Sequence, residues 1–292
     1  MLMFAFQVKE EKKIRVICDS DTACEADDPF ALTHALLSPK LIVKVITVEH
    51  FKLPGSMELS WQAARRVTDA LGSEVPVLKG EIGPGQTGDI SEGVQAIIAE
   101  ARRDDPRPLF LLCMGALTNI ARAFKEAPDI QEHVTVVTIG GNEYGEPVTW
   151  PEYNFGNDPD AANTVLSSRA EIWQIPNNAY GSIRIGLAEL QTKVRPFGAI
   201  GRYLFDQMIA YNDLPSTTWT PGESWSLGDS PSVAVTLDPQ CGRYSMRQAL
   251  RIKPDTSYGE AVRDKVIRVY ESIDSRYLLE DFFAKLQLKQ MQ

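Results

Sequence analysis

Residues 14–28 read IRVICDSDTACEADD, an apolar run followed at once by five carboxylates within ten residues. Ile14–Cys18 has the composition of a buried strand, and Asp27–Leu37 has a helical pattern with Pro29 in its first turn. The acidic segment, residues 19–28, therefore joins a core strand to a helix. Like charges this close repel one another unless a cation compensates, and Ca²⁺ and Mg²⁺ prefer carboxylate oxygens. We interpret the acidic segment as the floor of a metal-dependent active site rather than as a solvated loop.

Apolar runs alternate with helical patterns through the first two thirds of the chain. Further strands are expected at residues 41–48, 75–78, 109–114, 134–139 and 171–175, and helices at 57–71, 91–103, 116–127 and from 158 onward. This alternation predicts an α/β fold with a Rossmann-like, open, mostly parallel sheet flanked by helices. Such sheets bind ligands at the carboxyl ends of their strands, where the acidic segment lies. We expect one domain over residues 1–292, with the mainly helical stretch 181–226 as a cap or insertion.

The composition favours a small ligand that is neutral or cationic. The net charge is −9 and the sequence pI is near 5.0, without a basic patch of the kind that binds nucleic acid. No apolar run approaches the roughly 20 residues of a membrane span, and the apolar residues 1–6 are too few for the core of a signal peptide. Four cysteines without a CxxC pair fit a reducing compartment, so we expect a cytoplasmic protein with neither nucleic-acid nor membrane partners.

Four ordered segments between about residues 14 and 240 carry a family resemblance. They are Asp19-Ser-Asp21 with Asp27-Asp28; Gly115-Ala-Leu-Thr-Asn119-Ile-Ala; Gly140-Gly141 with Glu152-Tyr-Asn154 and Asp158-Pro-Asp-Ala-Ala162; and Gly228-Asp229-Ser-Pro-Ser-Val-Ala234. Together they resemble the inosine–uridine preferring nucleoside hydrolases, which open with a strand followed by Asp-x-Asp-Pro-Gly-x-Asp-Asp. This chain has two extra residues in that motif. The resemblance implies the nucleoside hydrolase fold and an N-glycosidase that splits ribonucleosides into ribose and base.

The resemblance also implies a Ca²⁺ site and a ribose site. Carried over position by position, the calcium ligands would be Asp21, Asp28, Asp229 and the main-chain carbonyl of Met114. Asp21 would in addition be the catalytic base that takes the proton from the attacking water. The candidates for substrate binding are Asp27, Glu152, Asn154, His50 and Asn142, and Asp19 would support the acidic segment from behind. Members of the family are commonly homodimers or homotetramers, so we expect a homo-oligomer that acts on a nucleoside or related riboside.

Departures from the family pattern leave the protonation of the leaving base open. The family's general-acid histidine, which precedes the last calcium ligand, is Gly228 in this chain, and His50 is one candidate replacement. Three aromatic side chains could instead stack on a base, namely Tyr144, Trp150 and Trp225. Glu25 could join the metal ligands or cap the helix that follows it, and we favour the cap.

Two alternatives to an N-glycosidase remain. Without the histidine, the chain could be a non-catalytic protein that keeps the metal and sugar site. Asp19-Ser-Asp21-Thr22 also fits the Asp-x-Asp-x-Thr pattern of haloacid dehalogenase-type phosphatases, in which Asp19 would be the nucleophile. Against the phosphatase, Gly228-Asp229 lacks the second downstream aspartate expected for its magnesium site.

Overall fold

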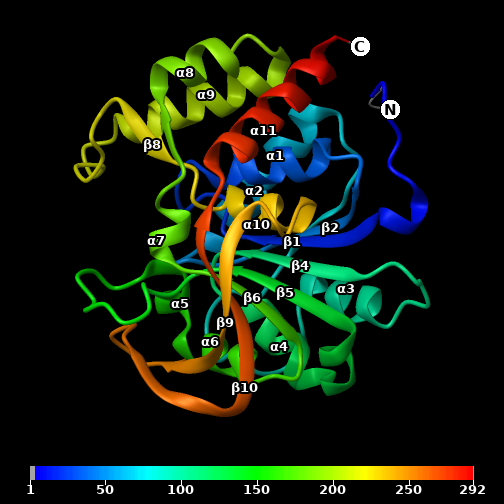
Figure 1. Ribbon diagram of the computed structural model, residues 1–292, viewed down its shortest axis with the longest axis vertical. Helices are drawn as coiled ribbons and strands as arrows, with labels where there is room; N and C mark the ends of the chain where they lie inside the picture. The colour runs from blue at the N-terminus through cyan, green and yellow to red at the C-terminus, as the bar shows by residue number, and fades with distance from the viewer. Residues whose placement is uncertain (1–3, 292) are drawn as a thin grey trace.

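A central eight-stranded sheet runs through the computed structural model, which describes residues 4–291 (Figure 1). The strand order is β3-β2-β1-β4-β5-β6-β10-β9, and every neighbouring pair is parallel except β10 and β9. The strands are β1 (Ile14–Ser20), β2 (Leu41–Val48), β3 (Val77–Lys79), β4 (Leu109–Met114), β5 (Val134–Ile139), β6 (Glu171–Ile175), β9 (Gly242–Ile252) and β10 (Tyr258–Ile273). A small antiparallel sheet pairs β7 (Arg184–Gly186) with β8 (Ser224–Ser226).

Helices cover both faces of the sheet, as the alternating pattern predicted. The α-helices of the described chain are α1 (Asp28–Leu37), α2 (Ser56–Leu71), α3 (Glu92–Ala101), α4 (Thr118–Glu126), α5 (Tyr153–Asn157), α6 (Pro159–Leu166), α7 (Asn177–Tyr180), α8 (Leu187–Lys193), α9 (Gly198–Asn212), α10 (Ser230–Leu237) and α11 (Ser275–Gln290). Two 3₁₀ helices, η1 (Glu10–Lys12) and η2 (Pro128–His133), complete the list. The predicted Rossmann-like, mostly parallel α/β fold is confirmed.

The two faces of the sheet carry two separate hydrophobic cores. Side chains alternate along a strand, so in β1 Val16 and Cys18 face one core while Ile17 faces the other. The first core packs under α1, α2, α9, α10 and α11, on the upper side in Figure 1, and the second packs under α3, α4 and α6. This arrangement buries β1 and β4 on both faces and directs their carboxyl ends toward α1 and α4.

The antiparallel hairpin of β9 and β10 is absent from our sequence-based expectations. Exposed side chains such as Arg243 and Met246 alternate along β9 with less exposed ones, so this edge strand lacks the continuous apolar run that marks the central strands. The stretch 181–226 contains β7, α8, α9 and β8, and its helix α9 packs against α2. Its interpretation as a cap or insertion of a single domain stays a prediction.

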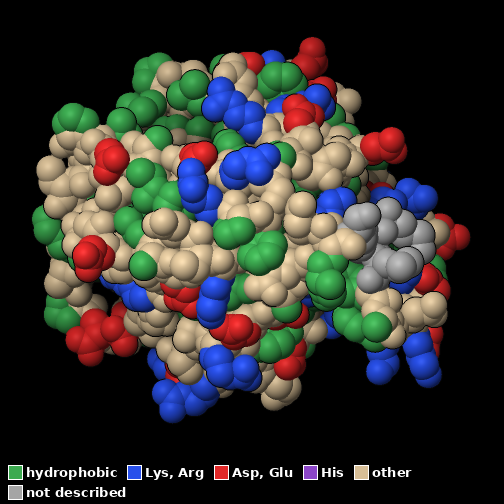
Figure 2. All heavy atoms as spheres, turned by 90° about the horizontal axis from the view of Figure 1, so that it is seen from above, with side chains coloured by type: hydrophobic (Ala, Val, Ile, Leu, Met, Phe, Trp, Pro, Cys, Tyr) green, Lys and Arg blue, Asp and Glu red, His purple; other side chains and the backbone are tan. Residues whose placement is uncertain are grey.

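On the face of the molecule shown in Figure 2, basic and acidic side chains are interspersed, and charges of one sign do not gather into a large patch. Within residues 4–291, the helices are all too short or too polar to cross a lipid bilayer.

Candidate active site

The acidic segment forms a tight loop between β1 and α1. The amide of Cys24 donates to the carbonyl of Asp21 at 2.7 Å, which closes a turn directly after the strand. Helix α9 holds the far side of the loop: the Tyr211 hydroxyl donates to the Cys24 carbonyl at 2.9 Å, and the Gln207 amide donates to the Ala26 carbonyl at 2.7 Å. The loop is therefore fixed from two sides, although its sequence contains neither the proline nor the glycine of the family motif.

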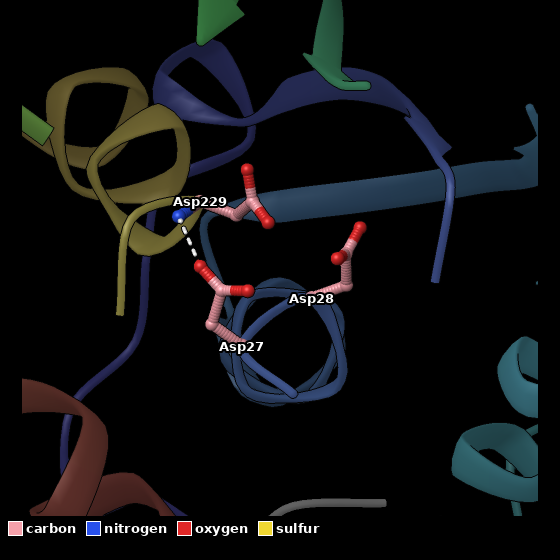
Figure 3. A group of neighbouring side chains, drawn as sticks. All are labelled: Asp27, Asp28 and Asp229. Atoms are coloured by element: carbon pink, nitrogen blue, oxygen red, sulfur yellow. Dashed lines mark hydrogen bonds between the residues drawn. The ribbon is translucent and has the colours of Figure 1, made fainter. Parts of the chain in front are cut away.

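Three aspartates meet where the N-termini of α1 and α10 lie side by side (Figure 3). Asp27 and Asp28 come from the start of α1, and Asp229 directly precedes α10; each helix has a proline in its first turn. One carboxylate oxygen from each aspartate lies within 4.8 Å of the others. The Asp229 amide also donates to Asp27 Oδ2 at 3.3 Å, and the Ser20 hydroxyl donates to Asp28 Oδ1 at 2.6 Å. This cluster could hold a metal ion.

The protonation behaviour of these aspartates fits a cation site. Burial raises the pKa of Asp27 to about 6 and, with the charge of Asp27 added, that of Asp28 to about 8. Burial, and then the charges of Asp28 and Asp27, raise the pKa values of Asp21 and Asp229 well above the ordinary range. Asp21 Oδ2 is buried without a hydrogen-bond partner in the described structure. A divalent cation among these groups would favour their charged forms and satisfy that oxygen.

The end of β4 lies against Asp21. Ser20 pairs with Met114 in the register of β1 and β4, so the two chains leave the sheet together. A Cβ on Gly115 would lie 2.9 Å from Asp21 Cγ, which only glycine avoids. The main chain that follows Met114 is therefore packed directly on this carboxylate.

A pocket of about 80 Å³ opens over the cluster. Its lining consists of Asp21, Cys24, Glu25, Asp27, Asp28, Ile139, Tyr153, Asn154, Tyr180, Gly228 and Asp229. The expectation that Glu25 caps α1 is wrong: the N-cap residue is Asp27, and Glu25 lines the pocket because the two extra residues of the loop carry it there. Burial and the charges of Asp27 and Asp28 raise the pKa of Glu25 to about 8.

Glu152 and Asn154 lie at the start of α5, beside the pocket. The Glu152 carboxylate caps this helix by accepting hydrogen bonds from the amides of Asn154 and Phe155. The Tyr180 hydroxyl donates to Glu152 Oε1 at 3.3 Å, and Tyr180 rather than Glu152 lines the pocket. Asn154 does line the pocket, and its side-chain amide donates to the Ile139 carbonyl at 3.0 Å. Glu152 therefore lies behind Tyr180 and not in the pocket lining.

Asp19 lies beneath the pocket, fully buried. Its Oδ1 accepts hydrogen bonds from the Thr47 hydroxyl at 2.5 Å and from the Asn119 amide at 2.8 Å. The Asn119 main-chain amide donates in turn to Glu49, a buried carboxylate that sequence analysis did not single out. These bonds connect the ends of β1 and β2 to the start of α4, which fits the expected supporting place of Asp19.

Two predicted substrate-binding residues lie outside the pocket lining. His50 Nε2 is 2.8 Å from the Thr118 hydroxyl, which donates to Asp158, so this buried chain joins α4 to α6. The Asn142 amide donates to the Thr256 carbonyl at 2.9 Å. No described contact of either residue reaches the acidic segment, and their roles in substrate binding stay predictions.

The aromatic side chains of the pocket differ from those we expected. Trp225 is buried against Tyr211, Trp150 is 81% exposed, and Tyr144 stacks on Tyr258 at 4.3 Å between ring centroids. Tyr153 and Tyr180 line the pocket instead. Both could have been suspected from sequence: Tyr153 is the middle residue of the Glu152-Tyr-Asn154 segment, and Tyr180 follows shortly after the carboxyl end of β6.

Comparison with known proteins identifies relatives of the chain. Residues 16–280 match the family model described as inosine-uridine preferring nucleoside hydrolase. The non-specific ribonucleoside hydrolase RihC of Escherichia coli (strain SE11) is 27% identical over 178 residues, which cover 52% of this chain and 58% of that protein. RihC of Shigella boydii serotype 18 matches with the same identity and coverage. The chain thus spans a little over half the length of the curated relatives it matches.

Solved structures share the fold. The purine-preferring ribonucleoside hydrolase from Gardnerella vaginalis has a TM-score of 0.76 at 24% identity, with 95% of this chain and 100% of that chain covered. The inosine-uridine preferring nucleoside hydrolase from Bacillus anthracis has a TM-score of 0.74 at 15% identity, with 94% and 99% covered. The fold is therefore shared over nearly the whole chain, and the family match itself reaches residue 280.

Proposed function

The chain belongs to the inosine-uridine preferring nucleoside hydrolase family, and on that premise we propose that it hydrolyses the N-glycosidic bond of ribonucleosides with the help of a bound Ca²⁺ ion. One observation carries the proposal. Carboxylates from the β1–α1 loop and from the start of α10 line one pocket together with Asn154, although Asp27 and Asp229 are 202 residues apart in sequence. Burial of each carboxylate costs desolvation free energy and so destabilises the fold. A cluster of buried acids therefore indicates a functional site rather than a structural one.

The proposed Ca²⁺ ligands are Asp21, Asp28, Asp229 and the carbonyl of Met114. The unpartnered Oδ2 of Asp21, the clustering of Asp28 with Asp229 and the packing of Gly115 on Asp21 all support this set. Asp27 belongs to the same cluster, so its proposed contact with a ribose hydroxyl competes with a place among the metal ligands. When bound, the cation supplies Lewis acidity that lowers the pKa of a neighbouring water.

The chain's own residues would perform the remaining steps. Asp21 accepts the proton of the water that attacks C1′, and Asn154 and Asp27 hold sugar hydroxyls so that C1′ faces this water. The carboxylates around the pocket stabilise the positive charge that develops on the ribose ring. Glu152 accepts a hydrogen bond from the Tyr180 hydroxyl and so positions Tyr180 in the pocket wall. The expected homodimer or homotetramer stays a prediction.

The two alternatives differ in how well the geometry supports them. As a phosphatase nucleophile, Asp19 would need to face substrate, yet it is fully buried, bonded to Thr47 and Asn119, and absent from the pocket lining. A non-catalytic sugar-binding protein would use the same pocket as the hydrolase, so only turnover separates the two.

The test is the release of reducing sugar from a panel of nucleosides by protein stripped of metal and then reloaded with Ca²⁺. We expect ribose and free base in equal amounts, loss of turnover on chelation and its return with Ca²⁺. Asp21→Asn, measured under the same conditions, should lose most of its turnover. Tight binding of nucleoside or ribose without turnover would replace the hydrolase with a binding protein.

A further inference from the structure

We propose that a buried polar cluster between α1 and α11 positions the aspartates at the start of α1 and opens when the protein is acidified. This His34 cluster consists of His34, Ser38, Asp281 and Lys285. Its positioning role rests on the proposed metal site, whereas its response to pH depends only on the contact between the two helices.

The His34 cluster lies beside an aromatic contact of the two helices. α11 lies on α1 (Figure 1), and the Phe282 ring is 5.9 Å from Phe30 and 5.7 Å from His34 between ring centroids. His34 Nε2 is 2.8 Å from Asp281 Oδ2, and the same oxygen accepts a hydrogen bond from the Lys285 ammonium group. His34 is 1% exposed and Lys285 is 7% exposed. The imidazole and the ammonium group are therefore almost excluded from water.

The cluster also fixes the end of α1. Lys285 Nζ donates to the Ser38 hydroxyl at 2.9 Å, and that hydroxyl donates to the His34 carbonyl at 2.7 Å. Ser38 is the C-cap residue of α1, so one ammonium group of α11 binds the last turn of the neighbouring helix. Apolar side chains would join two helices at least as firmly, whereas directed hydrogen bonds favour one alignment. The cluster therefore specifies how α1 lies along α11.

The alignment of α1 decides where its two aspartates lie. Asp27 is the N-cap residue and Asp28 the first residue of this helix, which has 10 residues. Asp28 is therefore only about 9 Å from His34 along the helix axis. Because so short a helix moves as one rigid body, a shift of its last turn also displaces the carboxylates that line the pocket. His34, Asp281 and Lys285 are thus positioning residues for the aspartates.

The His34 side chain has no acceptor for a second proton. An ionised carboxylate only accepts hydrogen bonds, so Nε2 carries the proton of the neutral ring, and Nδ1 is buried without a partner among the described residues. The charged groups that face the ring are Asp281 and Lys285, both on α11. The other elements that pack on α1, namely α2, α10 and β2, present to it no described charged group close enough to influence it. Burial lowers the pKa of His34, and the hydrogen bond to Asp281 opposes this shift without cancelling it.

Acidification therefore favours opening of this helix contact. Below the ordinary histidine pKa near 6.5, the closed cluster binds fewer protons than the open one, so the free energy of opening decreases as the pH falls. At pH 5.5 an exposed histidine is about 90% protonated, whereas the closed ring resists protonation. Opening should consequently become up to about tenfold more frequent between pH 7.5 and pH 5.5.

The first experiment measures amide hydrogen exchange in α1 and α11 of the metal-free protein at pH 7.5 and pH 5.5. His34→Gln is the variant that does not titrate, because a glutamine amide donates a hydrogen bond but takes up no proton. The protection of these amides in the wild-type protein, divided by their protection in His34→Gln at the same pH, should fall several-fold at the lower pH. Division at each pH cancels the intrinsic pH dependence of exchange and the contributions of the buried aspartates. His133→Gln, which removes an exposed histidine from η2, should behave as the wild-type protein does.

The second experiment measures Ca²⁺ binding by calorimetry at pH 7.5. His34→Ala removes the donor to Asp281 and should weaken Ca²⁺ binding about fivefold, although residue 34 touches no proposed ligand. His34→Gln restores a donor and should bind Ca²⁺ within about twofold of the wild-type protein. Ile97→Ala is the control for lost stability, because Ile97 is buried in the core on the other face of the sheet. We expect normal Ca²⁺ binding in this control.

Each part of the inference can be overturned separately. A protection ratio that is the same at both pH values would refute opening by acid. Ca²⁺ binding by His34→Ala as tight as that of the wild-type protein would refute the positioning role, and equal weakening in Ile97→Ala would assign the effect to lost stability instead. A wild-type protein that binds no Ca²⁺ would refute the proposed metal site and with it the positioning role, while hydrogen exchange would still decide the response to pH.

Discussion

The ring of Tyr180 lies against Gly228 so closely that a Cβ at residue 228 would be 3.1 Å from Tyr180 Cδ2. The same Cβ would lie 3.3 Å from Asp27 Oδ2. Tyr180 thus occupies the space into which a side chain before Asp229 would project, and that is the position of the histidine in the family pattern. The absence of a side chain at residue 228 therefore leaves the space in which the Tyr180 ring packs.

Gly228→Ala should lower kcat/KM about tenfold, because the new methyl group forces Tyr180 or Asp27 to move by a few tenths of an ångström. Tyr180→Ala opens the space that the methyl group needs. In the double variant, the loss should therefore be smaller than the product of the two single losses, with a coupling energy of about 1 kcal/mol. Steady-state kinetics of the four proteins measure this coupling. Strictly multiplicative losses would show that the contact has no bearing on activity.

Gly115→Ala should lower kcat about 100-fold while the protein stays folded. The added Cβ would lie 2.9 Å from Asp21 Cγ, and displacement of a catalytic carboxylate by about 1 Å can cost that much. Gly83→Ala is the matched control, because its Cβ would meet only the Gln86 side chain at 3.9 Å. Turnover and thermal melting of both variants provide the comparison. Normal turnover in Gly115→Ala would separate Asp21 from catalysis.

Asp28→Ala and Asp21→Asn should fail in different ways. Asp28 is clustered with Asp229 and proposed as a metal ligand, so its truncation should abolish Ca²⁺ binding and activity together. Asp21→Asn keeps an oxygen that can coordinate but loses the base, so it should retain some Ca²⁺ binding and lose most turnover. Calorimetric titration with Ca²⁺, paired with kinetics, distinguishes the two. Near-normal turnover in Asp21→Asn would reject its role as the general base.

Tyr211→Phe should raise KM about fivefold with little change in kcat. The Tyr211 hydroxyl holds the Cys24 carbonyl, and one such bond contributes roughly 1 kcal/mol to the order of the acidic segment. Tyr203→Phe removes a hydroxyl from the same helix α9 at a half-buried site that makes no described hydrogen bond to the loop, and it serves as control. Equal effects of the two substitutions would show that helix packing, rather than the bond to the loop, is responsible.

The parts of the fold that could be predicted are those in which one physical force dominates. β4 reads LFLLCM because both faces of a central parallel strand are buried, and such a run leaves little choice of structure. β9 and β10 escaped prediction because they lie at the edge of the sheet, where many side chains face solvent and the pattern is set by pairing between distant residues. Residues such as Arg243 give no local sign of a strand.

The candidate site shows the same division. Asp21 and Asp28 attracted attention because carboxylates that follow a buried strand and begin a helix lie where such sheets bind ligands, whereas Asp229 was chosen only through the family resemblance. The place of Glu25 could not be derived, since it depends on how two extra residues bend a loop held by α9. Trp225 was a candidate for base stacking by residue type alone, whereas packing against Tyr211 removes it from the pocket.

The stability of the metal-free protein should fall as the pH rises from about 4 to 8. In the folded chain the pKa is about 6 for Asp27 and about 8 for Asp28 and Glu25, against ordinary values near 4 in the unfolded chain. Between these values the folded protein binds more protons than the unfolded one, so the free energy of unfolding decreases with increasing pH. A bound cation offsets this loss because it favours the charged carboxylates.

The difference in melting temperature between protein with Ca²⁺ and protein with chelator should therefore be small at pH 5 and reach several degrees at pH 8. Comparison at each pH cancels the contributions of groups that the cation does not affect. Asp28→Ala should show almost no such difference at either pH, since it lacks a proposed ligand. A Ca²⁺ effect of equal size at pH 5 and pH 8 would mean that the ion binds elsewhere, because protonation of the aspartate cluster would then have no influence on its affinity.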